Sequence, residues 1–344
     1  MMKMLLRAGL GLAGLLAAVS VATAAPPEQN WSQLVAAAKK EGRVVVYSGY
    51  ITPTHKEIAA AFEKKYGIHV DYLVGRGSEI NERVRVEQVA GRFLADVSHN
   101  ALSSTRTTSE ARDHTLEPMG VALPNQARLK PDFADRVDKF EVPIFTINYG
   151  FLVNTNLVSK ADMPKSWQDL LDPKWKGKIL SDDPRVSGGG RVMFQMTYTR
   201  LGRQYHEKLA AQQPVFARDY RQSAQRVARG EYPIYIPFIL SLYKSIEGLP
   251  VTYVIPAEGV TYGSYAVSIY KNPPHPNAAR LLANFYLSDE AQAIYAKSGD
   301  GIVVSNLKEK LPPDLEALAN VKPLAPEDFS RIDEFYKYAR EIYK

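Results

Sequence analysis

The chain of 344 residues is 45% hydrophobic and 23% charged with a formal net charge of +6, which excludes a disordered chain, a collagen-like repeat and a multi-span membrane protein. It contains no cysteine, which excludes disulfides, thiolate metal sites, cysteine nucleophiles and a lipid-anchoring N-terminal cysteine. Because single hydrophobic cores stop growing at about 250 to 300 residues, we expect two lobes.

The N-terminal segment has the three parts of a secretory signal peptide. Lys3 and Arg7 give a positive start, an uncharged stretch rich in Leu, Ala and Gly follows, and an A-x-A cleavage site ends at Ala24. We therefore expect residues 1–24 to be removed and the mature protein to be periplasmic. Charges of alternating sign along the predicted helices are typical of solvated faces and predict no nucleic-acid partner.

The first part of the mature chain alternates helices and strands. The patterns predict helices over 31–41, 55–66 and 79–90, and strands over 43–47 and 68–74. This order, with short glycine turns, implies an α/β fold with a mainly parallel sheet covered on both faces. Ligands bind at the carboxyl ends of such strands, where the turns 48–54 and 75–78 lie.

The rest of the chain continues this alternation. The patterns predict strands over 146–153, 234–236, 251–255 and 265–270, and helices over 191–201, 277–286 and 288–297. A short helix starts at Ser166, is cut by Pro173 and leads into a strand near Ile179. No repeat or low-complexity linker divides the chain, so we expect it to cross between the lobes more than once.

Several motifs resemble one family of transport proteins. The segment S-W-Q-D-L-L-D-P-K-W-K-G-K-I at 166–179 follows Y-G-F-L-V-N-T-N at 149–156, and V-V-V-Y-S-G at 44–49 lies near the mature start. Together with H-P-N-A-A-R-L-L-A-N-F-Y-L-S-D-E-A-Q at 275–292, they resemble periplasmic solute-binding proteins of ABC importers. The resemblance is to the ferric-iron-binding type, a cluster like extracellular solute-binding protein family 1.

This resemblance implies a two-lobed, type II-like periplasmic-binding-protein fold with a hinge between the lobes. By the family pattern, lobe one comprises residues 25–118 plus 253–298, and lobe two comprises 119–252 plus 299–344. The implied role is to bind a solute between the lobes as a monomer and to present it to an inner-membrane permease. No cofactor is implied.

Iron is an alternative cargo. Iron binders of the cluster have two adjacent tyrosines where this sequence has Leu240 and Ser241, which cannot replace two phenolates on a hard cation. The segment His55-Lys56-Glu57 does resemble that of some iron binders. Ferric ion held with a synergistic anion therefore remains a second interpretation.

A serine and three glycines open the helix predicted at 191. Ser187, Gly188 and Gly189 leave backbone N–H groups unobstructed at a helix start, where the dipole favours negative charge. An ordinary capped turn would explain the glycines equally, but three in a row exceed what a cap requires. We expect an anion to bind here.

An anion of useful affinity needs further partners, and an arginine should be among them. The remaining candidate contacts are Ser48, Tyr50, Arg76, Ser78, Tyr149, Arg185, Tyr235, Phe238 and Ser264. The arginines could equally be surface cations, and the aromatic residues could equally pack in the core. Asp182 and Asp183 stand before Pro184 and are expected to start a turn.

Catalysis has little support in the sequence. The six histidines show no H-x-x-x-H or H-E-x-x-H spacing, and no G-x-S-x-G motif is present. We therefore expect a binding protein for a small anionic solute, of phosphate-ester, phosphonate or carboxylate type, rather than an enzyme. A secreted α/β hydrolase is the rival, and it would need a nucleophile beside a base.

Overall fold

The structure is a computed structural model that describes residues 27–49, 54–75, 77–102 and 115–344. One continuous sheet of ten strands runs through these residues, in the order β2-β1-β3-β10-β5-β8-β6-β7, with β4 on β10 and β9 on β5. The strands are β1 Arg43–Ser48, β2 His69–Val74, β3 Val97–Ala101, β4 Leu116–Glu117, β5 Glu141–Asn154, β6 Ile179–Asp182, β7 Val215–Ala217, β8 Ile234–Ile239, β9 Val251–Val254 and β10 Thr261–Tyr270. The signal-peptide prediction falls on residues outside the described ranges.

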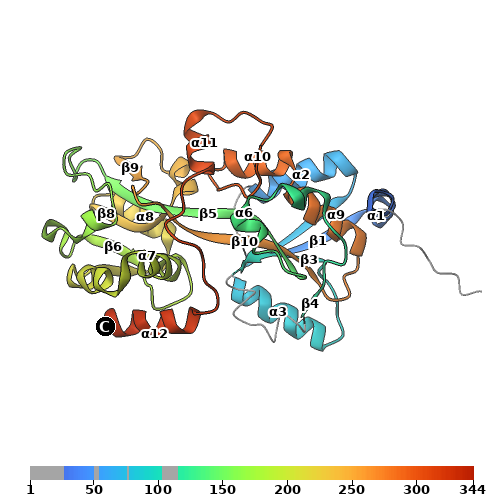
Figure 1. The fold of residues 1–344 in the computed structure, drawn as a ribbon, viewed down its shortest axis with the longest axis horizontal. Coiled ribbons are helices and arrows are strands. Elements are labelled where there is room, and N and C mark those ends of the chain that lie inside the picture. Colours follow the sequence, from blue (N-terminus) through green and yellow to red (C-terminus); the bar gives the residue numbers. More distant parts are fainter. Residues whose placement is uncertain (1–26, 50–53, 76, 103–114) are drawn as a thin grey trace, which may run out of the picture.

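Helices gather around the two ends of this sheet. They are α1 Pro27–Glu41, α2 Thr54–Tyr66, α3 Gly77–Val89, α6 Pro131–Ala134, α7 Gly189–Ala211, α8 Tyr220–Ala228, α9 Pro276–Tyr286, α10 Asp289–Lys297, α11 Pro313–Ala319 and α12 Ile332–Ile342, with short 3-10 turns η1 Pro124–Arg128, η2 Gln168–Leu171, η3 Pro173–Trp175 and η4 Leu240–Ser245. Figure 1 shows two groups of elements along the long axis. We call the group with α1, α2, α3 and α9 the first lobe, and the group with α7, α8 and α12 the second lobe.

Two long strands join the lobes. β5 and β10 pair antiparallel, from Thr261 opposite Tyr149 to Ser268 opposite Glu141, and both run across the middle of the molecule (Figure 1). In the first lobe β1 pairs parallel with β2 and β3, and in the second β6 pairs parallel with β7 and β8. The predicted parallel sheet is thus confirmed in each lobe, whereas the joining strands are antiparallel.

The predicted helices and strands are all present, with ends that differ by a few residues. The main differences are that α7 continues past a kink at Gly202 and that β5 starts at Glu141. The patterns missed β3, β4, β7, α8, α11 and α12. The strands among these are short and of mixed polarity, so their periodicity is weak. α8 and α12 are amphipathic helices whose helical pattern was overlooked.

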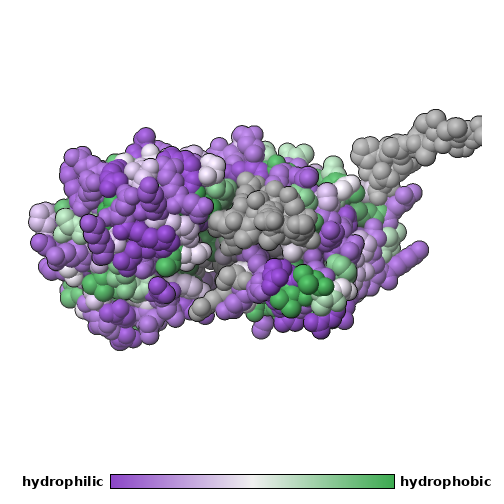
Figure 2. Space-filling view, turned by 90° about the horizontal axis from the view of Figure 1, so that it is seen from below, coloured by the Kyte–Doolittle hydropathy of each residue, from purple (hydrophilic) through white to green (hydrophobic). Residues whose placement is uncertain are grey.

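The surface is predominantly hydrophilic on the face seen from below (Figure 2). Large exposed apolar side chains are scattered, and Val89 on α3 is the most exposed of them at 80%. Scattered apolar residues are normal for a folded protein and require no partner.

The tryptophan of the 166–179 motif anchors the second lobe. Trp167 is fully buried, packs edge-on against Phe151 with ring centroids 4.8 Å apart, and donates from Nε1 to the carbonyl of Gly259 at 2.9 Å. The motif therefore ties β5 to the segment that enters β10.

We expect Trp167→Phe to lower the free energy of unfolding by about 1 to 3 kcal/mol, because the carbonyl of Gly259 loses its donor in a buried site. Trp175→Phe is the matched control, since the buried Nε1 of Trp175 has no hydrogen-bond partner within the described residues. Urea unfolding of both variants measures the difference. Equal losses would show that the hydrogen bond to Gly259 adds nothing.

Candidate functional site

The serine and glycine turn packs directly on the end of a strand. Gly188 has φ +144°, which only glycine adopts easily, and α7 starts at the next residue. A Cβ on Gly190 would lie 2.7 Å from backbone atoms of Asp182 and Asp183, at the carboxyl end of β6. The glycines therefore allow the helix start to sit against the end of the sheet.

The first amides of α7 are available to a ligand. Gly188 offers no side-chain cap, and no hydrogen bond inside the described ranges reaches the N–H groups of Gly189 and Gly190. The first N–H groups of a helix lack internal acceptors, and the helix dipole makes this end attractive to an anion.

An arginine that the sequence analysis did not single out lies in this first turn. The Arg191 side chain is buried, with 3% of its surface exposed, and its Nη1 donates to Oε1 of Gln195 at 3.0 Å. It makes no ion pair with any residue that the structure describes. A buried cation without a counter-ion is costly to fold, which is typical of a ligand-binding residue.

A carboxylate faces the same turn from the end of β6. Asp182 Oδ1 accepts a 2.7 Å hydrogen bond from the hydroxyl of Tyr235 on β8. Its Oδ2 lies 3.0 Å from the position of a Cβ on Gly189. Burial raises the pKa of Asp182 to about 7, with a smaller contribution from the carboxylate of Asp219.

Tyr149 on β5 is the last residue of this group. Its Cε1 lies 3.2 Å from the position of a Cβ on Gly189, and its side chain is only 8% exposed. Its hydroxyl has no hydrogen-bond partner among the described residues. Burial raises its pKa well above the usual range, and the charge of Asp182 adds to this effect while that of Arg191 opposes it. We call Tyr149, Asp182, Gly188–Arg191 and Tyr235 the glycine-turn site.

The structure brings together five of the predicted contacts and separates others. Ser187, Gly188, Gly189, Tyr149 and Tyr235 lie at or beside the glycine-turn site. Tyr235 and Phe238 are both fully buried in the core of the second lobe, but the hydroxyl of Tyr235 reaches Asp182, whereas Phe238 has no polar atom to offer.

Arg185 and Ser264 also point elsewhere. Arg185 makes hydrogen bonds to Asp183 and to the carbonyl of Tyr343, and its guanidinium lies over the ring of Phe216. These partners of Arg185 all lie in the second lobe. The hydroxyl of Ser264 accepts a hydrogen bond from Nη1 of Arg136 at 3.1 Å, on the face of β10 opposite to Tyr149.

The first-lobe contacts are only partly described. Tyr50 and Arg76 lie outside the described residues, as does the side chain of Ser78. Ser48 ends β1, where its fully buried Oγ lies 3.0 Å from Nε2 of His55 and 2.9 Å from Nδ1 of His99.

This cluster of Ser48, His55 and His99 is the nearest approach to a nucleophile beside a base. Its serine is 0% exposed, and Nε2 of His99 lies 3.3 Å from the hydroxyl of Tyr295. Burial lowers the pKa of His99 well below its usual value, which keeps its ring neutral. A serine nucleophile must reach its substrate, so this burial favours a structural network.

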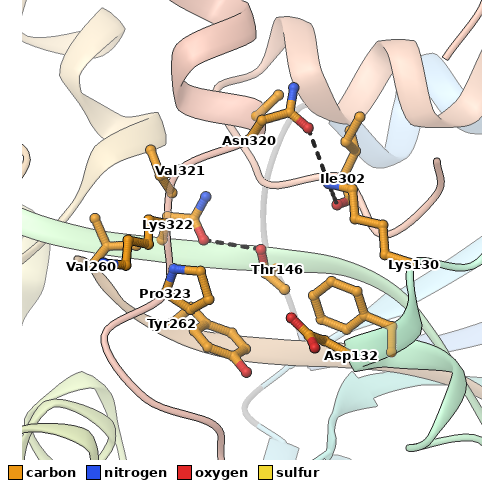
Figure 3. A pocket seen from close by; sticks show the side chains of 13 residues that line it. Lys130, Asp132, Thr146, Val260, Tyr262, Ile302, Asn320, Val321, Lys322 and Pro323 are labelled. Carbon is orange, nitrogen blue, oxygen red and sulfur yellow. Dashed lines mark hydrogen bonds between the residues drawn. The ribbon is translucent and has the colours of Figure 1, made fainter. Parts of the chain in front are cut away.

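A concave feature lies against one face of the joining strands (Figure 3). We call it the rear pocket. It encloses about 340 Å³ and is lined by Lys130, Asp132, Phe133, Thr146, Asn148, Val260, Tyr262, Ile302, Ala319, Asn320, Val321, Lys322 and Pro323. Asn148 and Tyr262 face each other across β5 and β10, so side-chain alternation puts this pocket and Tyr149 on opposite faces.

Key polar groups of the rear pocket are already paired. Burial lowers the pKa of Lys130 to about 8, and its Nζ donates to the carbonyl of Ile302 and to Asn320. Asn148 donates to the carbonyl of Leu318 and accepts from Thr146. In the glycine-turn site, by contrast, the amides of Gly189 and Gly190 and the hydroxyl of Tyr149 have no partner among the described residues, and Arg191 has no ion pair there. It is therefore the better candidate for ligand binding.

Metal ligands do not gather at either place. In the part of the chain that the structure describes, no three His, Cys, Asp or Glu side chains are placed to hold a metal ion. Leu240 and Ser241 lie in η4, immediately after β8.

Comparison with known proteins places this fold in a family. Residues 113–330, more than half of the chain, match the model of the bacterial extracellular solute-binding proteins. The chain belongs to this family. A putative 2-aminoethylphosphonate-binding periplasmic protein of Salmonella typhimurium is 26% identical over 257 residues, covering 71% of this chain and 72% of that protein. An uncharacterized protein of Haemophilus influenzae is 26% identical over 287 residues, covering 78% and 79%.

Solved structures show the same architecture in other solute-binding proteins. The periplasmic binding protein P5PA matches with a TM-score of 0.63 at 26% identity, covering 88% of this chain and 97% of that chain. AfuA of Actinobacillus pleuropneumoniae, with fructose-6-phosphate bound, matches with a TM-score of 0.65 at 25% identity, covering 88% and 96%. Iron-bound HitA of Pseudomonas aeruginosa shares the fold, with a TM-score of 0.69 at 21% identity over 87% of this chain and 99% of that chain.

The fold is thus the two-lobed one of periplasmic binding proteins that serve ABC importers, and the predicted family and architecture are confirmed. Across the described ranges, no helix combines the length and the hydropathy needed to cross a bilayer.

Proposed function

We propose that this solute-binding protein captures a small anionic solute, of phosphate-ester, phosphonate or carboxylate type, and delivers it to an ABC permease. The observation that carries the proposal is the first turn of α7, where the buried Arg191 has no ion pair and the amides of Gly189 and Gly190 have no acceptor within the described ranges. An anion bound there would supply the missing counter-ion and would accept charge-assisted hydrogen bonds.

The relatives support an anionic ligand. One is named for binding 2-aminoethylphosphonate, and the structure of another holds fructose-6-phosphate. Both ligands carry a tetrahedral phosphorus group with several oxygens. Such a group can accept several N–H donors at once, as the start of α7 offers them.

We further propose that the ligand closes the two lobes upon each other. The lobes are joined by β5 and β10, and Tyr149 on β5 belongs to the glycine-turn site. Contacts from the first lobe, for which Tyr50, Arg76 and Ser78 are the candidates, would complete the site. A ligand that touches both lobes binds the closed form better and so shifts the population towards it.

In this proposal the mature protein, without residues 1–24, works in the periplasm. It acts as a monomer and catalyses no reaction. We place the lobe boundaries near residues 118, 252 and 298, as the family resemblance implies. The segment after the first boundary still contacts the first lobe, since the N–H of Asn125 donates to Asn284 on α9. The chain therefore still touches the first lobe after the boundary near residue 118.

Isothermal titration calorimetry tests the proposal with ethylphosphonate, fructose 6-phosphate, citrate and Fe³⁺ as probes. We expect at least one organic anion to bind, and Arg191→Met to weaken its binding about ten- to hundredfold, because a charge-assisted hydrogen bond contributes about 1.5 to 3 kcal/mol. Replacing an unpaired buried charge by an apolar side chain of similar size should not unfold the protein.

Arg200→Met is the matched control, since Arg200 is exposed on the same helix. It should leave the affinity unchanged. Binding of Fe³⁺ alone, or an affinity that does not depend on Arg191, would contradict the proposal.

A further inference from the structure

The glycine-turn site holds two charges of opposite sign, and neither has an ionic partner inside the described part of the chain. Arg191 is hydrogen-bonded only to the neutral Gln195, and Asp182 only to the neutral Tyr235. The two do not form an ion pair with each other. An anion alone would neutralise Arg191 and would leave Asp182 as an uncompensated charge beside it.

The surroundings of Asp182 increase its need for a cation. Its Oδ2 has no hydrogen-bond partner among the described residues, and it lies against Gly189, where no side chain intervenes. The carboxylate of Asp219 acts on it and repels it. Asp219 itself caps α8 by accepting the N–H groups of Arg221 and Gln222.

Tyr149 lies close to both charges, since the charges of Asp182 and Arg191 both act on it. The amide of Gly189 has no hydrogen-bond acceptor among the described residues, and the position of its missing Cβ borders Asp182 and Tyr149. The buried hydroxyl of Tyr149 has no partner among the described residues and can accept a hydrogen bond. The carboxylate of Asp182 and the hydroxyl of Tyr149 can therefore accept hydrogen bonds from an ammonium group, which has three N–H donors.

We propose that the ligand is a small zwitterion, whose acidic group binds the first amides of α7 and Arg191 while its ammonium group binds Asp182. This inference rests on the proposed function, because it requires the acidic group to bind first. It narrows the solute class from anions in general to amino-phosphonates and related amino acids with a short spacer.

Matched ligand pairs that differ only in the ammonium group test the inference. Calorimetry at about pH 8 would compare 2-aminoethylphosphonate with ethylphosphonate, and β-alanine with propionate. We expect the amino ligand of at least one pair to bind at least tenfold more tightly. In Asp182→Asn this advantage should disappear, because the amide keeps the hydrogen bond from Tyr235 but carries no charge.

Asp162→Asn is the control, since Asp162 is an exposed carboxylate of the same lobe that pairs with Lys174. It should preserve the tenfold difference. If ethylphosphonate or propionate binds as well as its amino partner, the inference fails and the proposed function stands. If no member of either pair binds, the inference fails, and the probes of the preceding section decide the proposed function separately.

Discussion

Replacing Asp182 by asparagine is expected to stabilise the ligand-free protein at about pH 8 by roughly 2 to 4 kcal/mol. The native site raises the pKa of Asp182 from 3.8 to about 7. One unit of pKa shift corresponds to about 1.4 kcal/mol, and the partial exposure of this carboxyl group reduces the full effect. Urea unfolding, with the free energy extrapolated to water, measures the gain.

The sign of the pH dependence follows from the raised pKa. Between about pH 4 and pH 7 the folded state keeps the proton of Asp182 while the unfolded state has lost it, so the stability of the wild type falls as the pH rises. Above about pH 7 Asp182 is charged in both states, and the full free-energy cost of burying this charge is present. The advantage of Asp182→Asn should therefore at least halve between about pH 8 and pH 5.

Asp162→Asn again supplies the control, because hydrogen bonds to Ser159 and Lys174 lower the pKa of Asp162 rather than raise it. Its stability relative to wild type should stay constant over this range. An Asp182→Asn variant that is less stable than wild type at every pH would show that the carboxylate is satisfied within the protein, and it would remove the ground for a bound ammonium group.

This expectation expresses a general feature of binding sites. Groups that must meet a ligand are left without partners in the empty protein, so they reduce stability until the ligand arrives. The rear pocket shows the opposite case, since Lys130 and Asn148 already have partners of their own. The glycine-turn site and the rear pocket therefore differ in whether their polar groups already have partners.

The fold could be predicted well from the sequence because its periodic signals are local. The runs at 43–47 and 68–74 predicted β1 and β2, and the apolar spacing over 55–66 predicted α2. The antiparallel crossing of β5 and β10 could not be predicted from local signals. It pairs residues more than a hundred positions apart, such as Thr261 with Tyr149.

The candidate site could be predicted only in part. The glycines of the turn were identifiable because their backbone role is local. Asp182 was interpreted as a turn former, and Arg191 was not singled out, because nothing in a sequence shows which charges lack a partner. Conversely, Arg185 was a candidate until the structure showed Asp183, two residues away, as its partner.

The second large effect is expected at Gly190. A Cβ there would lie 2.7 Å from the carbonyl carbon and oxygen of Asp183 and from the carbonyl oxygen of Asp182, none of which can rotate away. Gly190→Ala must therefore push the start of α7 off the end of β6. We expect a loss of about 2 to 3 kcal/mol in the free energy of unfolding, as for overpacked cores. Urea unfolding and calorimetry with the best organic anion would be measured on the same sample.

The same displacement should reduce the affinity for the anion at least tenfold, because the amides of Gly189 and Gly190 move together with the charge of Arg191. Gly75→Ala is the matched control, since a Cβ there meets its nearest atom, in Ile80, at 3.4 Å. It should change stability by less than about 1 kcal/mol. If Gly190→Ala is destabilised while ligand affinity is retained, then the strand-to-helix packing is structural and the ligand binds elsewhere. If both properties fall together, the close approach of β6 and α7 is what holds the anion donors in place.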